Sequence, residues 1–278
     1  MSPGTPSPDP PDPQLPPVVG LDLDGVIWRG EEPIAPAVEG VARLRAAGLQ
    51  VVFISNNSSV PVGGVVDKLG GMGVDAEPAE VITSALAAAH LLRRDLPVGA
   101  RVLVCGGPGV YEALAAEGLT AVDEGPADAV VVGLNREFSY DVLSRASAAV
   151  RDGARFVATN LDNTYPVPGG LIPGAGAIVA AVAAAAGRRP EVAGKPSTPI
   201  ADLVRERFGS TGVMVGDRPS TDGAMADTLG WPFALVLSGV TAAVAPPGGE
   251  AIPAPAPPFV AADLGALVDP LLAAFLPS

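Results

Sequence analysis

The stretch Val18-Val-Gly-Leu-Asp22-Leu-Asp24-Gly-Val-Ile-Trp-Arg-Gly30 indicates how this chain folds. Its short apolar run is typical of a buried strand of a parallel sheet, and in such sheets the chemistry collects at the carboxyl ends of the strands. Alternation along an extended chain points Asp22 and Asp24 the same way, with Leu23 turned into the core. Two adjacent acids repel each other, and their oxygens suit a hard cation such as Mg²⁺. The alternative is a solvated turn, which an Asp-x-Asp-Gly sequence also favours.

Length, charge and cysteine content exclude several classes of protein. The 278 residues allow one large or two moderate domains with a sizeable core. The net charge of −13 would repel nucleic acid, and no basic stripe offsets it. No segment is apolar enough for a membrane span, and no secretory signal is visible, so we expect no membrane association. Cys105 is the only cysteine, which excludes a disulfide framework and fits a cytoplasmic location.

Histidine and lysine are scarce, which narrows the chemistry. His90 is the only histidine and lies in a plain helical pattern, which excludes a histidine metal cluster and argues against a Ser-His-Asp triad. Lysine occurs twice, at Lys68 and Lys195, against 15 arginines. Because lysine is so rare in this chain, a lysine in a loop suggests a specific role. Lys195 lies just ahead of a predicted helix that Ser197 or Thr198 would cap, where its charge could reach a phosphate.

The order of predicted elements favours an α/β fold with a Rossmann-like, doubly wound parallel sheet. Residues 1–17 contain eight prolines and are predicted to be a disordered or polyproline-like arm. Beyond the opening strand we predict core strands over 49–55, 212–216 and 233–237, helices over 36–47, 62–72 and 80–94, a helix after Lys195, and a last strand and helix within 259–275. Residues 246–258 form a proline-rich connector.

A second α/β unit is predicted over residues 84–189, which leaves 18–83 and 190–278 as the core domain. Its strands are expected at 101–105, 129–132 and 155–158, with helices between them. The glycine-rich segment 106–109 lacks the spacing of a dinucleotide-binding loop and is interpreted as an ordinary turn. The long polar loop over 159–170 has the character of a binding loop, although many surface loops look similar.

Polar residues follow three of the four predicted core strands. Ser55, Asn56 and Asn57 could cradle phosphate oxygens, although serine and asparagine also cap helices and both interpretations can hold. Asp217 ends another strand, and Asp222 follows within one turn. One such strand end is ordinary, whereas three in one sheet, with a lysine at a helix start, predict a site.

Four segments together resemble the motifs of haloacid dehalogenase-type (HAD) phosphatases. They are Asp22-Leu-Asp-Gly-Val, Ser55-Asn-Asn-Ser, Gly194-Lys195-Pro-Ser and Gly216-Asp217-Arg-Pro-Ser-Thr-Asp222. Their spacing resembles the type IIA branch of NagD-like and p-nitrophenyl phosphatases, in which an α/β cap of type C2 is inserted between the second and third motifs. Residues 84–189 would be that cap, and Asn160 and Asp162 resemble its substrate-facing loop. Ser220 departs mildly from relatives that carry an acid there.

The resemblance implies a role for each motif residue. Asp22 would attack phosphorus to form an aspartyl-phosphate, and Asp24 would protonate the leaving oxygen and then activate water. Mg²⁺ would bind the Asp22 carboxylate, the Asp24 backbone carbonyl and Asp217, while Asp222 orients the waters of the metal. The charge of the transferring group would be spread over Ser55, Asn56, Asn57 and Lys195.

Alternatives to a phosphatase remain open at this stage. The segment between the first two motifs is too short for the small helical cap of a phosphomutase. A phospho-accepting regulatory domain also gathers acids and a lysine, but it needs no insertion of this size. A Mg²⁺-dependent binding protein without turnover is the third option, which the reactive residues in all four motifs argue against.

The expected substrate is a small phosphoester. Residues 160–187 contain no lysine, arginine or histidine, which argues against a leaving group that carries a second phosphate. The cap also resembles that of actinobacterial glycerol-3-phosphate phosphatases, so glycerol 3-phosphate is our first expectation, with phosphoglycolate and pyridoxal phosphate as alternatives. The resemblance further suggests a homodimer through the cap.

Overall fold

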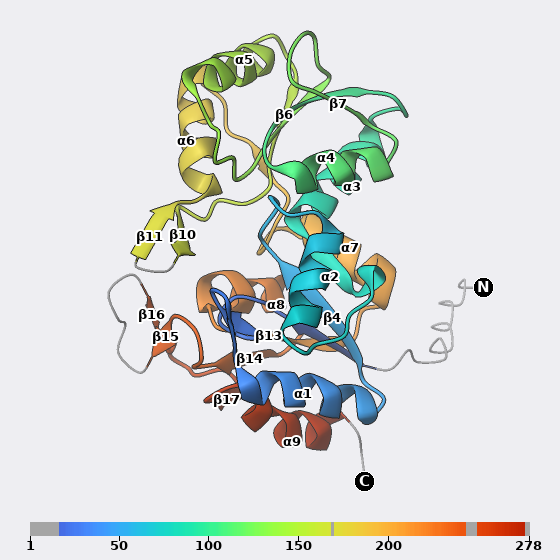
Figure 1. The fold of residues 1–278 in the computed structure, drawn as a ribbon, viewed down its shortest axis with the longest axis vertical. Coiled ribbons are helices and arrows are strands. Elements are labelled where there is room, and N and C mark those ends of the chain that lie inside the picture. The colour runs from blue at the N-terminus through green and yellow to red at the C-terminus, as the bar shows by residue number, and fades with distance from the viewer. Residues whose placement is uncertain (1–16, 168–169, 243–248, 276–278) are drawn as a thin grey trace, which may run out of the picture.

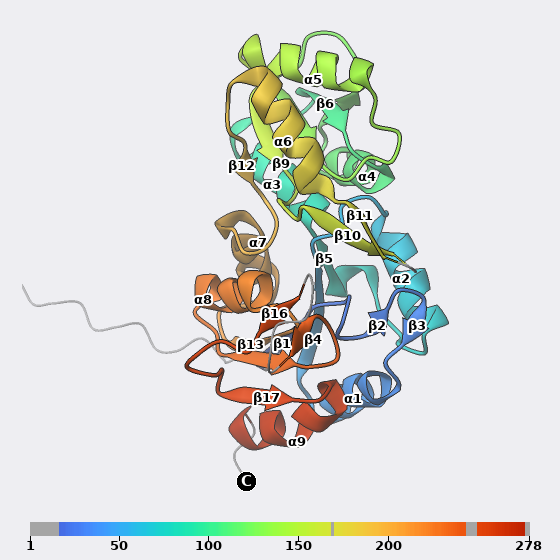
Figure 2. The ribbon, with the colours of Figure 1, turned by 90° about the vertical axis from the view of Figure 1, so that its left-hand side faces the viewer.

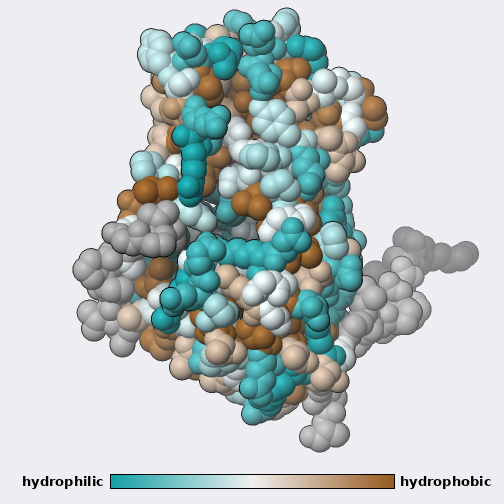
Figure 3. All heavy atoms as spheres, in the orientation of Figure 1, coloured by the Kyte–Doolittle hydropathy of each residue, from teal (hydrophilic) through white to brown (hydrophobic). Residues whose placement is uncertain are grey.

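A computed structural model describes residues 17–167, 170–242 and 249–275, arranged in a larger and a smaller lobe (Figure 1). Of the predicted Pro-rich arm over 1–17, all but Pro17 lies outside the described residues. On the face shown in Figure 3, hydrophilic and apolar residues are interspersed over both lobes. Among the described helices, none combines the length and apolar character needed to cross a membrane.

The larger lobe is built on a parallel sheet with six strands in the order β17-β14-β13-β1-β4-β5. The strands are β1 (Val18–Leu21), β4 (Gln50–Ser55), β5 (Val81–Thr83), β13 (Gly212–Gly216), β14 (Phe233–Val236) and β17 (Phe259–Ala261). One face is covered by α1 (Ala35–Ala46), α2 (Val62–Gly71) and α9 (Leu264–Phe275), and the other by α3 (Ser84–Asp95), α7 (Thr198–Phe208) and α8 (Ala224–Leu229). Because both faces are covered, the strands are almost continuously apolar, as predicted for a doubly wound sheet.

The register of the central strands brings the predicted site segments together. Leu21 of β1 lies beside Val215 of β13 on one side and Phe53 of β4 on the other. All three strands run parallel, so their carboxyl ends meet at one edge of the sheet. The residues that follow each strand therefore converge, although they lie far apart in the sequence.

The smaller lobe contains a second parallel sheet, with five strands in the order β12-β9-β8-β6-β7. Its strands are β6 (Arg101–Cys105), β7 (Thr120–Val122), β8 (Ala129–Val132), β9 (Arg155–Ala158) and β12 (Glu191–Val192). Helices α5 (Tyr140–Arg151) and α6 (Ala175–Ala186) pack on one face, and α4 (Pro108–Ala116) and α3 pack on the other. The division of the chain at 84 and 189 stays a prediction; β12, just beyond 189, pairs with β9 of this sheet.

Two local predictions are wrong. The helix predicted over 80–94 begins only at Ser84, because the β-branched run Val81-Ile-Thr83 forms β5 beside β4, and the Thr83 hydroxyl then accepts a hydrogen bond from the Leu86 N–H (3.2 Å). The loop predicted over 159–170 contains a strand of the hairpin β10 (Thr164–Val167) and β11 (Gly170–Pro173). In Figures 1 and 2 this hairpin lies on the side of the smaller lobe that faces the larger one.

Candidate active site

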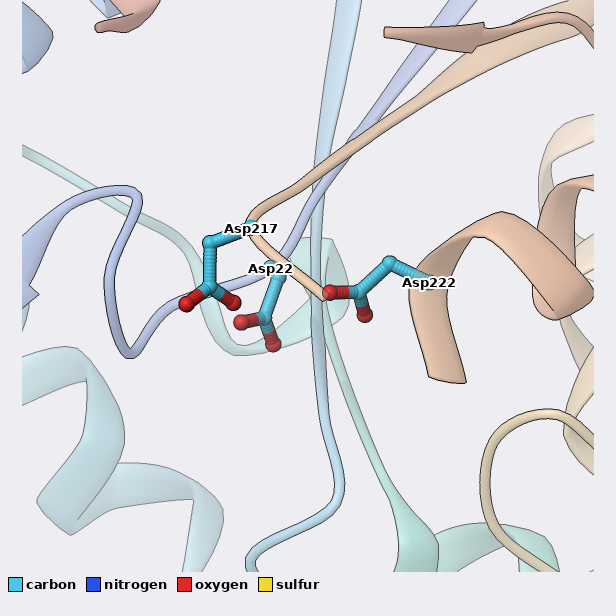
Figure 4. A group of neighbouring side chains, drawn as sticks. All are labelled: Asp22, Asp217 and Asp222. Carbon is cyan, nitrogen blue, oxygen red and sulfur yellow. The ribbon is translucent and has the colours of Figure 1, made fainter. Parts of the chain in front are cut away.

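Three carboxylates meet at the carboxyl edge of the larger sheet. Asp22 follows β1, Asp217 follows β13, and Asp222 lies on the turn Pro219–Gly223 that precedes α8. One ligand oxygen from each acid lies within 4.8 Å of the others (Figure 4). The convergence predicted from the strand ends is therefore present.

Burial and mutual repulsion disfavour the charged forms of these acids. Burial raises the pKa of Asp22 well above its usual value, and the charges of Asp222 and Asp217 add to this effect. Burial, reinforced by Asp222, raises the pKa of Asp217 to about 6. Burial also raises the pKa of Asp24, against a hydrogen bond from Trp28 that lowers it. A buried cluster of this kind calls for a positive charge at its centre.

Lys195 supplies part of that charge. Its ammonium group donates hydrogen bonds to Asp22 Oδ1 (2.6 Å) and Asp222 Oδ1 (2.8 Å), and the residue is only 4% exposed. Burial by itself would lower the pKa of Lys195, but the two carboxylates raise it above its usual value. One lysine cannot neutralise three acids, so the set retains the negative charge and the oxygen donors that suit a hard divalent cation.

The segment after β4 uses its side chains largely within the protein. Ser55 Oγ accepts a hydrogen bond from the Asn57 N–H (3.1 Å), and Asn57 Oδ1 accepts from the Ser59 N–H (2.9 Å). Asn56 Oδ1 accepts from the Lys195 N–H (2.7 Å), which joins the second motif to the third. The three residues of this segment that were predicted to bind phosphate also line the cavity described below. The capping interpretation therefore holds beside the predicted phosphate-binding role, which stays a prediction.

The two predicted cap residues anchor one lobe on the other. The Asn160 amide donates to the backbone carbonyl of Asn56 (2.7 Å), and the Asn56 amide donates to Asp162 Oδ2 (3.2 Å). Asn160 Oδ1 also accepts from the Asp162 N–H (3.0 Å), so the loop after β9 is fixed on the segment after β4. These residues face the cavity while holding the lobes together, and their predicted role in specificity stays a prediction.

All the predicted site residues line one cavity of about 260 Å³ between the lobes. They are Asp22, Asp24, Ser55, Asn56, Asn57, Asn160, Asp162, Lys195, Asp217 and Asp222. Tyr165, which the sequence places in the cap loop offered to the substrate, lines the cavity too, and so do Arg29 and Arg218, to which sequence reasoning gave no role. Residues 160–187 bring no lysine, arginine or histidine to this cavity, as their sequence requires, whereas the larger lobe brings the two arginines.

A backbone segment that sequence reasoning missed holds Asp217 in place. The Val240 N–H donates to Asp217 Oδ2 (2.7 Å). A Cβ added at Gly239 would lie 1.8 Å from the same oxygen, so only glycine leaves room for the carboxylate. The available signal was the Ser-Gly-Val-Thr sequence after β14, another strand end at the same edge of the sheet.

Comparison with known proteins identifies the family. A family model of haloacid dehalogenase-like hydrolases matches residues 19–120, and a HAD-hydrolase-like model matches residues 192–267. An acid sugar phosphatase of Staphylococcus saprophyticus is 38% identical over 205 residues, which cover 73% of this chain and 79% of that protein. The chain belongs to the haloacid dehalogenase-like hydrolases.

Other relatives of this HAD hydrolase are phosphatases too. A D-glycerol 3-phosphate phosphatase of Mycobacterium tuberculosis is 39% identical over 226 residues, which are 80% of this chain but only 63% of that longer protein. A glycerol phosphate phosphatase of the same organism, solved in complex with magnesium, has a TM-score of 0.80 at 36% identity and covers 90% of this chain and 76% of the other. A p-nitrophenyl phosphatase from Archaeoglobus fulgidus has a TM-score of 0.83 at 31% identity, with coverage of 93% and 100%.

The comparisons and the geometry agree on the cofactor. HAD phosphatases use Mg²⁺, and a relative was solved with that ion. In this HAD hydrolase the half-buried Asp22 and the buried Asp217 and Asp222 offer oxygen ligands close enough together to share one cation. The residues present therefore fit a magnesium ion.

Proposed function

We propose that this Mg²⁺-dependent HAD phosphatase hydrolyses small phosphomonoesters in the cavity between its lobes, through an aspartyl-phosphate on Asp22. The observation that carries the proposal is the meeting of Asp22, Asp24, Asp217, Asp222 and Lys195 in one cavity from three separate parts of the chain. An ion pair that only stabilises the fold rarely gathers so many acids at one point, whereas an active site for phosphoryl transfer needs them to hold the metal and to react.

Asp22 is the proposed nucleophile. Lys195 holds Asp22 Oδ1, which leaves Oδ2 to attack phosphorus. A P–O bond to Asp22 forms as the bond to the leaving oxygen breaks, so one difficult displacement becomes two easier ones. Water then attacks the aspartyl-phosphate, inorganic phosphate leaves, and the carboxylate of Asp22 is restored.

Asp24 is the proposed general acid and base. It lines the cavity two residues after the nucleophile, and burial raises its pKa, which favours the protonated form needed at the start. It gives its proton to the leaving oxygen in the first half of the reaction. In the second half it takes a proton from the attacking water and returns to its starting state.

The remaining polar groups would hold the metal and the phosphoryl group. The carboxylates of Asp22 and Asp217 and the backbone carbonyl of Asp24 would hold Mg²⁺, with Asp222 orienting its waters. When bound, the ion supplies positive charge beside the phosphoryl oxygens. Lys195 and the Ser55–Asn57 segment would take up the rest of that charge.

The cavity supports a small substrate, with glycerol 3-phosphate as the first candidate. A volume of about 260 Å³ suits a phosphate with a short polyol better than a nucleotide. Two similar proteins are named for glycerol phosphate, and the amide of Asn160 and the carboxylate of Asp162 could bind hydroxyl groups. Arg29 and Arg218 favour a second candidate, a phosphoester that carries a carboxylate, such as phosphoglycolate.

A substrate panel tests the function directly. The full chain would be assayed for phosphate release from glycerol 3-phosphate, phosphoglycolate, pyridoxal phosphate and p-nitrophenyl phosphate, with Mg²⁺ and with EDTA. We expect turnover only with Mg²⁺ and the highest kcat/KM on glycerol 3-phosphate. Asp22→Asn should abolish phosphate release, whereas Asp269→Asn, at an exposed acid of α9, should leave phosphate release unchanged. Equal phosphate release by Asp22→Asn and the unchanged chain would end the assignment.

Assembly and location are further proposals. We propose a homodimer through the smaller lobe because its cap resembles caps that carry a dimer contact; Tyr140, Leu161 and Leu171 are large apolar side chains exposed on this lobe. Light scattering of the purified chain would report the mass, and a monomeric mass would refute the dimer. The single, buried thiol of Cys105 supports a cytoplasmic location, which a fluorescent fusion would test.

A further inference from the structure

Trp28 is a buried aromatic residue whose indole faces the proposed general acid. Its Nε1–H donates a hydrogen bond to Asp24 Oδ1 (2.9 Å), and the residue is 4% exposed. The chain reverses between the two residues at Gly25, whose φ of +84° suits glycine and whose N–H donates to the Trp28 carbonyl (2.7 Å). The tight turn therefore builds this contact into the opening stretch of the fold.

Lys68 packs against the face of the indole. Its ammonium nitrogen lies 4.6 Å from the centroid of the Trp28 ring and donates to the backbone carbonyl of Gly30 (2.8 Å). A cation over an indole face is attracted by the ring electrons. Lys68 thus ties the hairpin of β2 (Trp28–Arg29) and β3 (Glu32–Pro33) to α2. This gives a structural reason for the second of the two lysines in the chain.

The hydrogen bond from Trp28 fixes which oxygen of Asp24 can deliver a proton. Rotation of the carboxyl group would break the bond to Oδ1, so the group is held in one orientation. Among the described residues, no hydrogen bond reaches Asp24 Oδ2. That oxygen is therefore the one available to the leaving group in the cavity that Asp24 lines.

We propose that Trp28 is a positioning residue for acid catalysis, supported by Lys68. The inference rests on the proposed role of Asp24. As the ester P–O bond breaks and the new P–O bond to Asp22 forms, the proton on Asp24 Oδ2 moves to the departing oxygen. Trp28 takes no part in bond making, but it keeps the proton donor aimed at that oxygen.

Two leaving groups of different basicity separate this role from a structural one. A departing alkoxide needs the proton, whereas p-nitrophenolate is stable without it. In Trp28→Phe, kcat/KM for glycerol 3-phosphate, or for the best alkyl ester of the panel, should fall about tenfold, the worth of one well-placed hydrogen bond. In the same variant, kcat/KM for p-nitrophenyl phosphate should stay within about twofold of that of the unchanged chain. Asp24→Asn should show the same selectivity with a larger loss.

Trp231 provides a matched control. It is 5% exposed, and its indole N–H also donates a hydrogen bond, to the Ser210 carbonyl (2.7 Å), at the opposite end of the sheet. Trp231→Phe should leave the ratio of the two kcat/KM values unchanged. Lys68→Met keeps the aliphatic stem but removes the cation. It should lower kcat/KM for the alkyl ester by about threefold and leave kcat/KM for p-nitrophenyl phosphate unchanged.

Each outcome decides the question. An equal loss on both esters, or no loss on either, in a folded Trp28→Phe protein overturns the inference. If Trp28→Phe does not fold, Lys68→Met alone tests the inference. An unchanged ratio of kcat/KM for the alkyl ester to kcat/KM for p-nitrophenyl phosphate in that variant overturns the inference. Failure of the proposed function looks different, because the unchanged chain would then release phosphate from neither ester, or Asp24→Asn would show no selectivity.

Discussion

Replacing Lys195 by methionine should destabilise the folded protein, because Asp22, Asp217 and Asp222 would then repel one another without a compensating positive charge. The ammonium group lies 2.6 Å from Asp22 Oδ1 and 2.8 Å from Asp222 Oδ1. The side chains of Lys195 and Asp222 are each only 2% exposed, so water cannot replace the lost charge. Methionine fills a similar volume, which keeps packing effects small.

The size of the effect follows from burial. Removal of one partner of a buried ion pair costs about 3–5 kcal/mol, because the other charge is left without compensation. For a chain of this size each kcal/mol corresponds to about 2–4 °C, so the melting temperature without metal should fall by about 6–20 °C.

The loss should also depend on pH. With Lys195 gone, the pKa of Asp22 and Asp217 should rise further above their unfolded values, so the folded state holds more protons than the unfolded state near neutral pH. Stability then falls as pH rises. The deficit of Lys195→Met should therefore be small near pH 5 and large near pH 8, and Mg²⁺ should restore part of it.

The assay is thermal unfolding followed by circular dichroism in EDTA, at pH 5 and pH 8, and again with Mg²⁺. Lys68→Met is the control, because the other lysine of the chain is 30% exposed and its loss should cost no more than about 1 kcal/mol. A melting temperature equal to that of the unchanged chain at pH 8, or a deficit independent of pH, would refute the reasoning.

Three other predictions follow from the site. Asp22→Asn should lower turnover by more than about 10³-fold, since an amide is a poor nucleophile. Its melting temperature in EDTA should be no lower than that of the unchanged chain, because the substitution removes one of three mutually repelling acids. A lower melting temperature would contradict that repulsion. The rise in melting temperature with Mg²⁺ should shrink below about pH 6, the pKa of Asp217, and a titration at several pH values checks this. Glu250→Gln should weaken Mg²⁺ binding by about tenfold in calorimetry, because Glu250 Oε2 accepts from the Ser220 N–H (3.0 Å) on the turn that carries Asp222; unchanged affinity would refute this.

Local sequence was a good guide to the elements but a poor guide to their exact limits. The central strands β1, β4 and β13 follow from short apolar runs bounded by glycine or polar residues. The hairpin β10–β11 was missed because its sequence is rich in turn-forming residues, and β5 was missed because three residues give a weak pattern beside a long helical one.

Within the site, sequence reasoning named the groups but not their partners. Asn57 lines the cavity, and its predicted phosphate-binding role stays a prediction, but the sequence did not reveal that its side-chain oxygen also accepts from the Ser59 N–H in a local turn. Arg29 and Arg218 were given no role in the pocket, because charge was counted along one loop instead of around a cavity. The indole hydrogen bond from Trp28 to Asp24 depends on a chain reversal at Gly25 that the sequence alone did not reveal.

The sequence by itself determined the chemistry, since two acids after a strand, a lone loop lysine and a further acid pair are properties of residue type and spacing. Only the tertiary structure decided how these charges offset one another, because Asp22 and Lys195 are 173 residues apart in the chain yet 2.6 Å apart in the fold. Electrostatic energy depends on distance and burial, which no local pattern contains and which the parallel packing of β1, β4 and β13 imposes.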